Sequence, residues 1–356
     1  MSVVGIDIGF GFTKACNGRN ALIFKSIFGE ATEIQYREQI LGSVPKGDHL
    51  QIELDGKSYF VGELAERQSN VRSFTLDQDQ LIGSFARIMA VTALSQLAGK
   101  NEQVRVVTGL PISYYRRHKE ELTRILTGKH DAVLVDSNGQ RNEVSVQVTH
   151  TRVIPQPFGT LFGHMLNDLA EIGNRRFAQE KIGIIDVGFR TSDYSISDRT
   201  RYSERGSQTT DTGIARAFAH IAARLRELTG VNVELYRLYD AVSRASIKIR
   251  GKNIDLRPVV EEAFTKLAST IATEVERLWA DDWDIDLIVI TGGGGAVLSP
   301  YLKQQIHGEL MELDSGSDAR LANVRGYWRY GMHLLNKEQQ REPAPPRPNN
   351  VRAARG

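Results

Sequence analysis

The chain has 356 residues, a formal net charge of +2 and a single cysteine, Cys16. This length is enough for two domains, and the 41% hydrophobic and 25% charged residues are typical of a globular protein. The small net charge creates no global field that would attract nucleic acid or an acidic membrane. One cysteine excludes an internal disulfide and a cysteine-cluster metal site. Since we find neither a secretory signal pattern nor an apolar run of the ~18 residues of a membrane span, we expect a cytoplasmic protein without a membrane contact.

The first motif lies at the N-terminus, where the apolar residues 3–8 run into glycines. We expect a strand that turns at Gly9 and Gly11 into a second strand, because glycine tolerates positive φ and lets backbone N–H groups approach an anion. Asp7 stands at the end of the first strand, where a carboxylate could hold a hydrated cation. Lys14 could reach a phosphate. Taken alone, this pattern is equally typical of a glycine-rich hairpin without a ligand.

The next segments predict the rest of a first domain. Residues 21–27 have the composition of a third strand. Alternating residues on both sides of an Asp-Gly pair predict a β-hairpin over residues 51–62. We place this hairpin in a small insertion subdomain at about residues 29–98. Apolar side chains at helical spacing predict a helix over residues 80–98.

Three further elements precede the middle of the chain. Residues 104–111 predict a strand that ends at a Gly/Pro break, and residues 132–149 alternate around an Asn-Gly pair as another hairpin. Residues 153–163 are expected to open a helix. Gln156 stands between two prolines at this helix start, and proline is favoured in a first helical turn.

The pattern of the N-terminus recurs in the second half of the chain. Residues 182–187 form an apolar run that contains Asp186, and Gly188 and a polar turn follow it. Downstream, apolar side chains share one face of a helix from Ile214 to Leu228, and Gly230 is placed to end this helix. Asp211 precedes the helix and is a candidate for its N-terminal cap.

The last third of the chain carries one more glycine motif. Residues 231–256 have little pattern and are assigned to an outer subdomain, and residues 260–278 predict a long helix with a steady apolar stripe. The strand at 287–291 runs into four glycines, which would let the backbone lie flat against a ligand before a helix starts at Ser299 and Pro300. Residues 337–356 predict a disordered basic tail.

Two Asp-x-Gly hairpins and a later strand that ends in glycines, in this order, resemble the actin-like ATPases, the superfamily of actin, heat-shock chaperone ATPases and sugar kinases. Within it, the chain is most similar to the ParM/StbA-type plasmid segregation proteins, over about residues 1–335, and the Thr-Gly-Leu-Pro phrase at 108–111 adds to this likeness. The resemblance implies an α/β actin-like ATPase fold. Two pseudo-symmetric, ribonuclease H-like domains, at 1–165 and 166–336, would flank a nucleotide cleft.

The same resemblance implies a site for ATP or GTP with Mg²⁺ between the hairpins. Asp7 and Asp186 would hold the metal. Together with Gln156, which would orient the attacking water, they are the implied catalytic residues. Phe189 and Arg190 stand where many members have small residues, and Arg190 could pair with a phosphate or a neighbouring subunit. The implied nucleotide contacts are Gly9, Gly11, Phe12, Thr13, Lys14, Gly188, Phe189, Arg190, Thr191, Asp211, Gly213, Gly292, Gly293, Gly294 and Gly295.

These expectations favour an ATPase that forms head-to-tail filaments of itself and segregates a plasmid or another DNA element. The modest charge favours capture of DNA through a separate DNA-binding adaptor over direct contact with nucleic acid. Because one fold supports several functions, two alternatives stay open. One is a small-molecule kinase of the sugar type, although the sequence shows no sugar-binding carboxylate motif. The other is a chaperone-like assembly ATPase, although no substrate-binding domain is evident.

Overall fold

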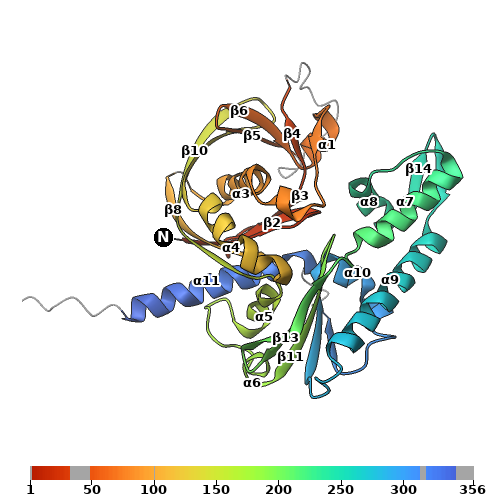
Figure 1. Cartoon of the computed structure of the whole chain (residues 1–356). Coiled ribbons are helices and arrows are strands. Elements are labelled where there is room, and N and C mark those ends of the chain that lie inside the picture. Colours follow the sequence, from red (N-terminus) through yellow and green to blue (C-terminus); the bar gives the residue numbers. More distant parts are fainter. Residues whose placement is uncertain (1, 33–48, 100, 313–317, 342–356) are drawn as a thin grey trace, which may run out of the picture.

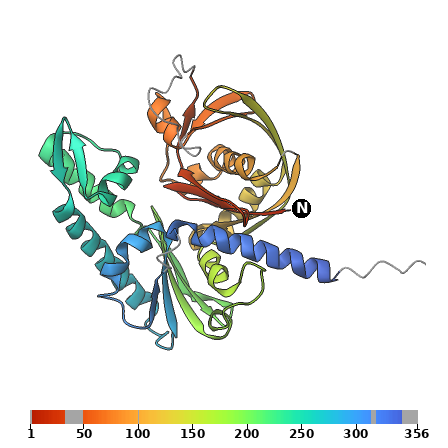
Figure 2. The same ribbon diagram turned by 180° about the vertical axis from the view of Figure 1, so that it is seen from behind.

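The computed structural model describes residues 2–32, 49–99, 101–312 and 318–341, which form two lobes of mixed α/β structure (Figures 1 and 2). The strands of the first lobe are β1 (Ser2–Ile8), β2 (Phe12–Cys16), β3 (Ala21–Lys25), β4 (Phe28–Glu30), β5 (Leu50–Leu54), β6 (Lys57–Val61), β7 (Arg72–Ser73), β8 (Glu102–Leu110), β9 (Gly128–Val135) and β10 (Arg141–Pro155). They make one ten-stranded sheet with the order β3-β2-β1-β8-β10-β9-β5-β6-β4-β7.

This sheet curls around helix α3 (Ser84–Leu97), as Figure 1 shows. Apolar side chains cover α3 on most sides, which is typical of a helix inside a core. The helix predicted over residues 80–98 is interrupted at Gly83, where φ is 139°, so that a short helix α2 (Gln78–Leu81) precedes α3. Leu81 of α2 is nevertheless buried in the same core.

The predicted hairpins at 51–62 and 132–149 are confirmed as β5–β6 and β9–β10, although the second is longer than expected. β5 pairs with β9, with Gln51 opposite Val135, so the first hairpin extends the main sheet instead of forming a sheet of its own. Helix α1 (Glu63–Gln68) follows β6. Residues 33–48 of the predicted subdomain lie outside the described residues.

The second lobe is built on a five-stranded sheet. Its strands are β11 (Lys181–Val187), β12 (Ser192–Asp198), β13 (Arg201–Thr210), β16 (Leu287–Thr291) and β17 (Leu310–Glu312). The order is β13-β12-β11-β16-β17, with β11 antiparallel to β12 and parallel to β16. In the first lobe, β1 is likewise antiparallel to β2 and parallel to β8. The two lobes therefore repeat one arrangement around their central strands.

Two long helices, α7 (Ala215–Thr229) and α9 (Arg257–Leu278), pack against each other in the second lobe. The helix predicted over 260–278 is confirmed as α9, and Gly230 ends α7 with a left-handed φ of 69° as predicted. Leu228 departs from the expected apolar stripe, because it is 59% exposed. Along the chain, α7 and α9 are connected by the short elements η1 (Leu235–Arg237), α8 (Leu238–Ser243), β14 (Ser246–Ile249) and β15 (Lys252–Asp255).

Helices α5 (Pro157–Met165) and α11 (Ala322–Arg341) lie between the lobes (Figures 1 and 2). They cross where two glycines meet, since a Cβ added to Gly326 would lie 1.7 Å from the carbonyl oxygen of Gly159. α11 also packs along β1 and β8 of the first lobe, and α5 contacts β11 and β12 of the second lobe. This pair of helices therefore bridges the two sheets.

Two predicted boundaries were wrong. Residues 153–155 complete β10 instead of opening a helix, because Pro155 still pairs with Leu110 of β8 and the first turn of α5 starts at Pro157. Residues 337–341 of the predicted tail belong to α11, which continues to Arg341, and residues 342–356 lie outside the described residues. Among the described helices, none has both the length and the apolar character needed to cross a membrane.

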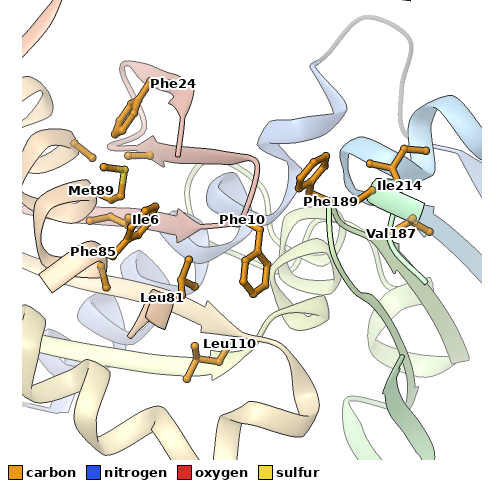
Figure 3. Packing of buried hydrophobic residues seen from close by; sticks show 14 of the residues in the cluster. Ile6, Phe10, Phe24, Leu81, Phe85, Met89, Leu110, Val187, Phe189 and Ile214 are labelled. Atoms are coloured by element: carbon orange, nitrogen blue, oxygen red, sulfur yellow. The ribbon is translucent and has the colours of Figure 1, made fainter. Parts of the chain in front are cut away.

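One buried apolar cluster continues from the first lobe into the second, and Figure 3 shows part of it. Ile6 and Phe85 lie on the side of the first lobe, and Val187 and Ile214 lie on the side of the second. Phe10 lies between them, at the turn that follows β1. The turns after β1 and β11 therefore meet in a shared core.

Candidate functional site

The turns after β1 and β11 have the same geometry. The N–H of Gly9 donates to the carbonyl oxygen of Phe12 at 3.2 Å, and the N–H of Gly188 donates to that of Thr191 at 2.9 Å. In the strand pairings, Asp7 lies opposite Lys14, and Asp186 lies opposite Asp193. The two Asp-x-Gly hairpins recognised in the sequence are thus structural counterparts, one in each lobe.

A cavity of about 840 Å³ lies between the hairpins. Helix α10 (Gly292–Leu302) also lines it, together with the end of β8 and the start of α5. The predicted site residues that line the cavity are Gly9, Gly11, Phe12, Lys14, Gln156, Gly188, Phe189, Thr191, Gly293 and Gly294. Three segments that are far apart in the sequence therefore meet at one cavity, as their glycine motifs suggested.

The two predicted carboxylates lie directly behind this lining and are each only 2% exposed. An oxygen of Asp7 accepts a hydrogen bond from the Lys14 ammonium at 2.7 Å, so Lys14 is held by an ion pair. An oxygen of Asp186 accepts a hydrogen bond from the Asn323 amide at 2.7 Å. Burial raises the pKa of Asp186 to about 6, and repulsion from Asp7 adds to this, while the Asn323 hydrogen bond opposes it.

This donor set suits Mg²⁺, which usually takes one or two carboxylates and completes its shell with water and phosphate oxygens. Asp7 and Asp186 would hold the ion, because each carboxylate uses one oxygen on a protein donor and has a second oxygen to offer. A cation would also compensate the two buried negative charges. The described residues contain no group of three or more metal-ligating side chains, so water and a ligand would supply the rest of the shell.

Gln156 occupies the N-cap position of α5 and lines the cavity. Its N–H donates to the carbonyl oxygen of Leu110 at 2.8 Å, and its own carbonyl oxygen accepts a hydrogen bond from the Tyr327 hydroxyl at 3.3 Å. The backbone of Gln156 is therefore held between β8 and α11. An amide side chain on such a fixed backbone can orient a small polar molecule in the cavity.

The four successive glycines do not lie flat as an extended loop, which corrects the prediction. They form the first turn of α10, and Pro300 lies inside this helix instead of near its start. Gly292 has a φ of 84°, and a Cβ there would lie 2.4 Å from an oxygen of Asp186. A Cβ on Gly294 would lie 2.8 Å from Val187. These two glycines let the start of α10 pack closely onto the end of β11, while Gly295 faces β16.

Six predicted contacts are not among the lining residues of the cavity: Gly292 and Gly295, described above, and Thr13, Arg190, Asp211 and Gly213. Thr13 is buried and shares a hydrogen bond of 2.9 Å with Ser26. Asp211 does not cap α7, because Ile214 occupies the N-cap position without a side-chain bond. Asp211 is instead exposed and lies 3.5 Å from Arg190 in an ion pair.

Arg190 stacks over the ring of Phe10, with 5.4 Å between the guanidinium carbon and the ring centre. The backbone N–H of Gly213 donates to the carbonyl oxygen of Arg190 at 2.9 Å, and a Cβ on Gly213 would lie 2.2 Å from the Arg190 carbonyl carbon. Gly213 therefore supports the turn of the second hairpin from behind. It does not face the cavity.

Several residues that complete the candidate site carry no motif in the sequence. Asn323 orients Asp186 from the first turn of α11, and no motif marked it. Other missed residues line the cavity, and they resemble ordinary core or surface positions in a sequence: Phe10, Phe218, Tyr239 and Arg320. The helical spacing of Phe218 did signal burial, but spacing does not distinguish a core from a cavity wall.

Two lobes with equivalent Asp-x-Gly hairpins that close on a shared cavity define the actin-like ATPase fold. Residues 5–159 match the family of actin-like proteins, N-terminal domain. Residues 184–304 match the family of archaeal actin homologues, MreB-like, C-terminal. No curated protein matches the chain at a significant level.

Solved structures agree with these matches. A non-polymerisable quadruple mutant of pCBH ParM has 26% identity to the chain and a TM-score of 0.77, over 93% of this chain and 98% of that one. A 15-stranded ParM filament from Clostridium botulinum gives 24% identity and a TM-score of 0.80, again over 93% and 98%. The archaeal actin homologue Ta0583, solved in complex with ADP, has 18% identity and a TM-score of 0.76, over 93% of this chain and 99% of that one. The chain therefore matches actin-like family models in both halves, and its structure is similar to those of ParM-type proteins.

Proposed function

We propose that the chain binds a nucleoside triphosphate with Mg²⁺ in the cavity, hydrolyses it, and uses this cycle to assemble and disassemble filaments. The observation that carries the proposal is the pair of equivalent hairpins on one cavity, with the buried carboxylates of Asp7 and Asp186 behind it. Two glycine turns facing one space suit a polyphosphate, since their N–H groups can approach its oxygens closely.

The proposed phosphate site has three sources of positive potential. The first is the set of backbone N–H groups in the two hairpin turns. The second is the first turn of α10, where the N–H groups of a helix N-terminus are free to bind an anion. The third is Lys14, which lines the cavity while its ammonium group contacts Asp7. Asp7 and Asp186 would then bind Mg²⁺ next to the phosphate oxygens.

Gln156 is proposed to orient the attacking water. A glutamine amide is not a strong base at neutral pH, but it can hold a water in line with the terminal phosphate. The two backbone hydrogen bonds of Gln156 hold the start of α5 against β8 and α11, which fixes the base of this side chain. This positioning supports a hydrolase more than a kinase, whose acceptor hydroxyl would have to replace the water.

The proposed biological role is the partition of a plasmid or another DNA element in the cytoplasm. Two structures similar to this chain are a ParM filament and a ParM mutant described as non-polymerisable. A head-to-tail contact between identical subunits that does not close produces a filament. The net charge of +2 favours recruitment of DNA through a DNA-binding adaptor.

The test follows 90° light scattering and phosphate release after Mg-ATP or Mg-GTP is added to the purified protein, with negative-stain microscopy of the product. We expect scattering to rise with nucleotide and protein concentration and phosphate to be released. Gln156→Ala should retain nucleotide affinity but hydrolyse about 100-fold more slowly, because the water is no longer oriented. Gln140→Ala changes an exposed glutamine in the β9–β10 turn and serves as the control. Flat scattering together with phosphate transfer to a sugar would refute the proposal.

A further inference from the structure

Tyr239 of α8 reaches from the second lobe to the first hairpin. Its ring centre lies 4.6 Å from that of Phe12 and 5.1 Å from that of Phe189, so it stands between the tips of the two hairpins. Phe218 of α7 packs on it at 5.3 Å. The Tyr239 hydroxyl lies directly over Gly11, where an added Cβ would be 1.9 Å from its oxygen. The position of this hydroxyl therefore requires glycine at position 11, because any side chain there would collide with it.

The Tyr239 hydroxyl oxygen is buried and has no hydrogen-bond partner among the residues that the structure describes. Tyr239 is one of the residues that line the cavity. Burial raises the pKa of Tyr239 well above its usual value, although Arg320 opposes this, so the group is a neutral phenol that can donate a hydrogen bond. A buried hydroxyl that makes no hydrogen bond is unfavourable, and native proteins rarely keep one without a reason.

The neighbouring tyrosine on the same segment provides a contrast. Tyr236 donates a hydrogen bond to Glu234, and its hydroxyl oxygen accepts one from Arg72 at 3.3 Å. The protein therefore satisfies one of the two hydroxyls with its own side chains. It leaves the other hydroxyl over the glycine turn of the first hairpin.

We propose that Tyr239 is a ligand-binding residue whose hydroxyl donates a hydrogen bond to a phosphate oxygen of the bound nucleotide. This inference rests on the proposed function, because it assumes that the hairpins hold a polyphosphate. None of the described residues accepts a hydrogen bond from the Tyr239 hydroxyl, so a ligand in the cavity is the acceptor that we propose. Phosphate oxygens are the proposed acceptors, because Gly11 lines the cavity in the glycine turn that is proposed to hold the polyphosphate.

Such a hydrogen bond would also let the second lobe contact a ligand that is bound to the first hairpin. Tyr239 belongs to α8, whereas Gly11 belongs to the turn between β1 and β2 and Phe12 begins β2. A phosphate under the hydroxyl would therefore be bound from both lobes. The predicted loss on removing the hydroxyl concerns affinity and not folding, because no residue in the described part of the chain loses a hydrogen bond.

The experiment compares Tyr239→Phe with Tyr236→Phe by isothermal titration with Mg-ATP, Mg-GTP, tripolyphosphate, adenosine and guanosine. Tyr239→Phe should bind the nucleotide that the wild type prefers, and tripolyphosphate, about 5- to 20-fold more weakly. Its affinity for the nucleoside and its melting temperature without ligand should not fall. Tyr236→Phe should keep the wild-type affinities within about twofold and melt at a lower temperature, because it loses bonds inside the protein.

Unchanged or tighter binding of tripolyphosphate and nucleotide by Tyr239→Phe would overturn the inference while leaving the proposed function intact. A loss that appears with the nucleoside and not with tripolyphosphate would also overturn it, since the hydroxyl would then contact the sugar or base. A wild-type protein that binds none of the phosphate-containing ligands would refute the proposed function itself, and the inference with it.

Discussion

Replacing Asp193 with asparagine should stabilise the protein, and the gain should grow as the pH rises. Asp193 is buried in the second lobe, where one of its oxygens accepts hydrogen bonds from the N–H of Ile112 at 2.8 Å and from the Thr209 hydroxyl at 2.5 Å. Ile112 begins helix α4 (Ile112–Leu126) of the first lobe. An asparagine carbonyl oxygen can accept the same two bonds without the charge.

The magnitude follows from the pKa of the carboxyl. Burial raises the pKa of Asp193 from 3.8 to about 7, with repulsion from Asp186 and Asp7 adding to it and the two hydrogen bonds opposing it. Between these two values the folded state holds a proton that the unfolded state has lost, so the wild-type protein loses stability as the pH rises through this window. At about 1.4 kcal/mol per unit, the penalty reaches about 4 kcal/mol above pH 7, and about 3 kcal/mol of it develops between pH 5 and pH 8.

The assay is urea unfolding of the wild type and Asp193→Asn at pH 5 and pH 8 in metal-free buffer. The advantage of the variant should grow by about 3 kcal/mol between the two values. Asp255→Asn is the control with the opposite sign, because Arg257 lowers the pKa of this exposed carboxyl to about 2 and its loss should not stabilise the protein. An advantage of Asp193→Asn that is constant with pH would show that this carboxyl does not carry the proposed proton.

Two further predictions concern packing. Gly213→Ala should lower the free energy of unfolding by about 2 kcal/mol or more, because the new Cβ would lie 2.2 Å from the Arg190 carbonyl carbon. The control is Gly99→Ala, whose Cβ would meet its nearest atom, in the Glu102 carboxylate, at 3.4 Å. Equal melting temperatures of the two variants would contradict this prediction. Cys16 is buried, and burial raises the pKa of its thiol. A disulfide reagent such as DTNB should therefore label about one thiol per chain in denaturant and label the native protein far more slowly. Rapid labelling of the native protein would contradict the packing of β2 described above.

The sequence was most informative where backbone conformation and residue type are tightly coupled. The spacing of Asp7, Gly9 and Lys14 was sufficient to predict a hairpin, because an apolar run that ends in glycines is typical of a strand followed by a turn. The reason expected was wrong, since neither Gly9 nor Gly11 has a positive φ. The repetition of this spacing from Asp186 onward predicted a second hairpin in an equivalent place. The actin-like fold could thus be predicted from local patterns in a fixed order.

The sequence was least informative where the meaning of a residue depends on a distant neighbour. Asn323 contacts Asp186 across 137 positions of sequence, and Tyr239 meets Gly11 only because the two lobes come together. The glycine run at 292–295 misled for a related reason. Glycine disfavours helices, yet close packing of α10 onto Val187 and Asp186 leaves no space for side chains at its first turn.

The crossing of α5 and α11 has a mechanical consequence. Where Gly159 and Gly326 touch, the two backbones are in direct contact, with no side chain between them that could yield. Packed interiors resist compression, so α5 and α11 should move together as one rigid body. Gln156 at the tip of one and Asn323 at the tip of the other would keep their spacing during any swing of the lobes. Strain from such a swing would then be absorbed at the hairpin tips and at the junction between Asp193 and α4.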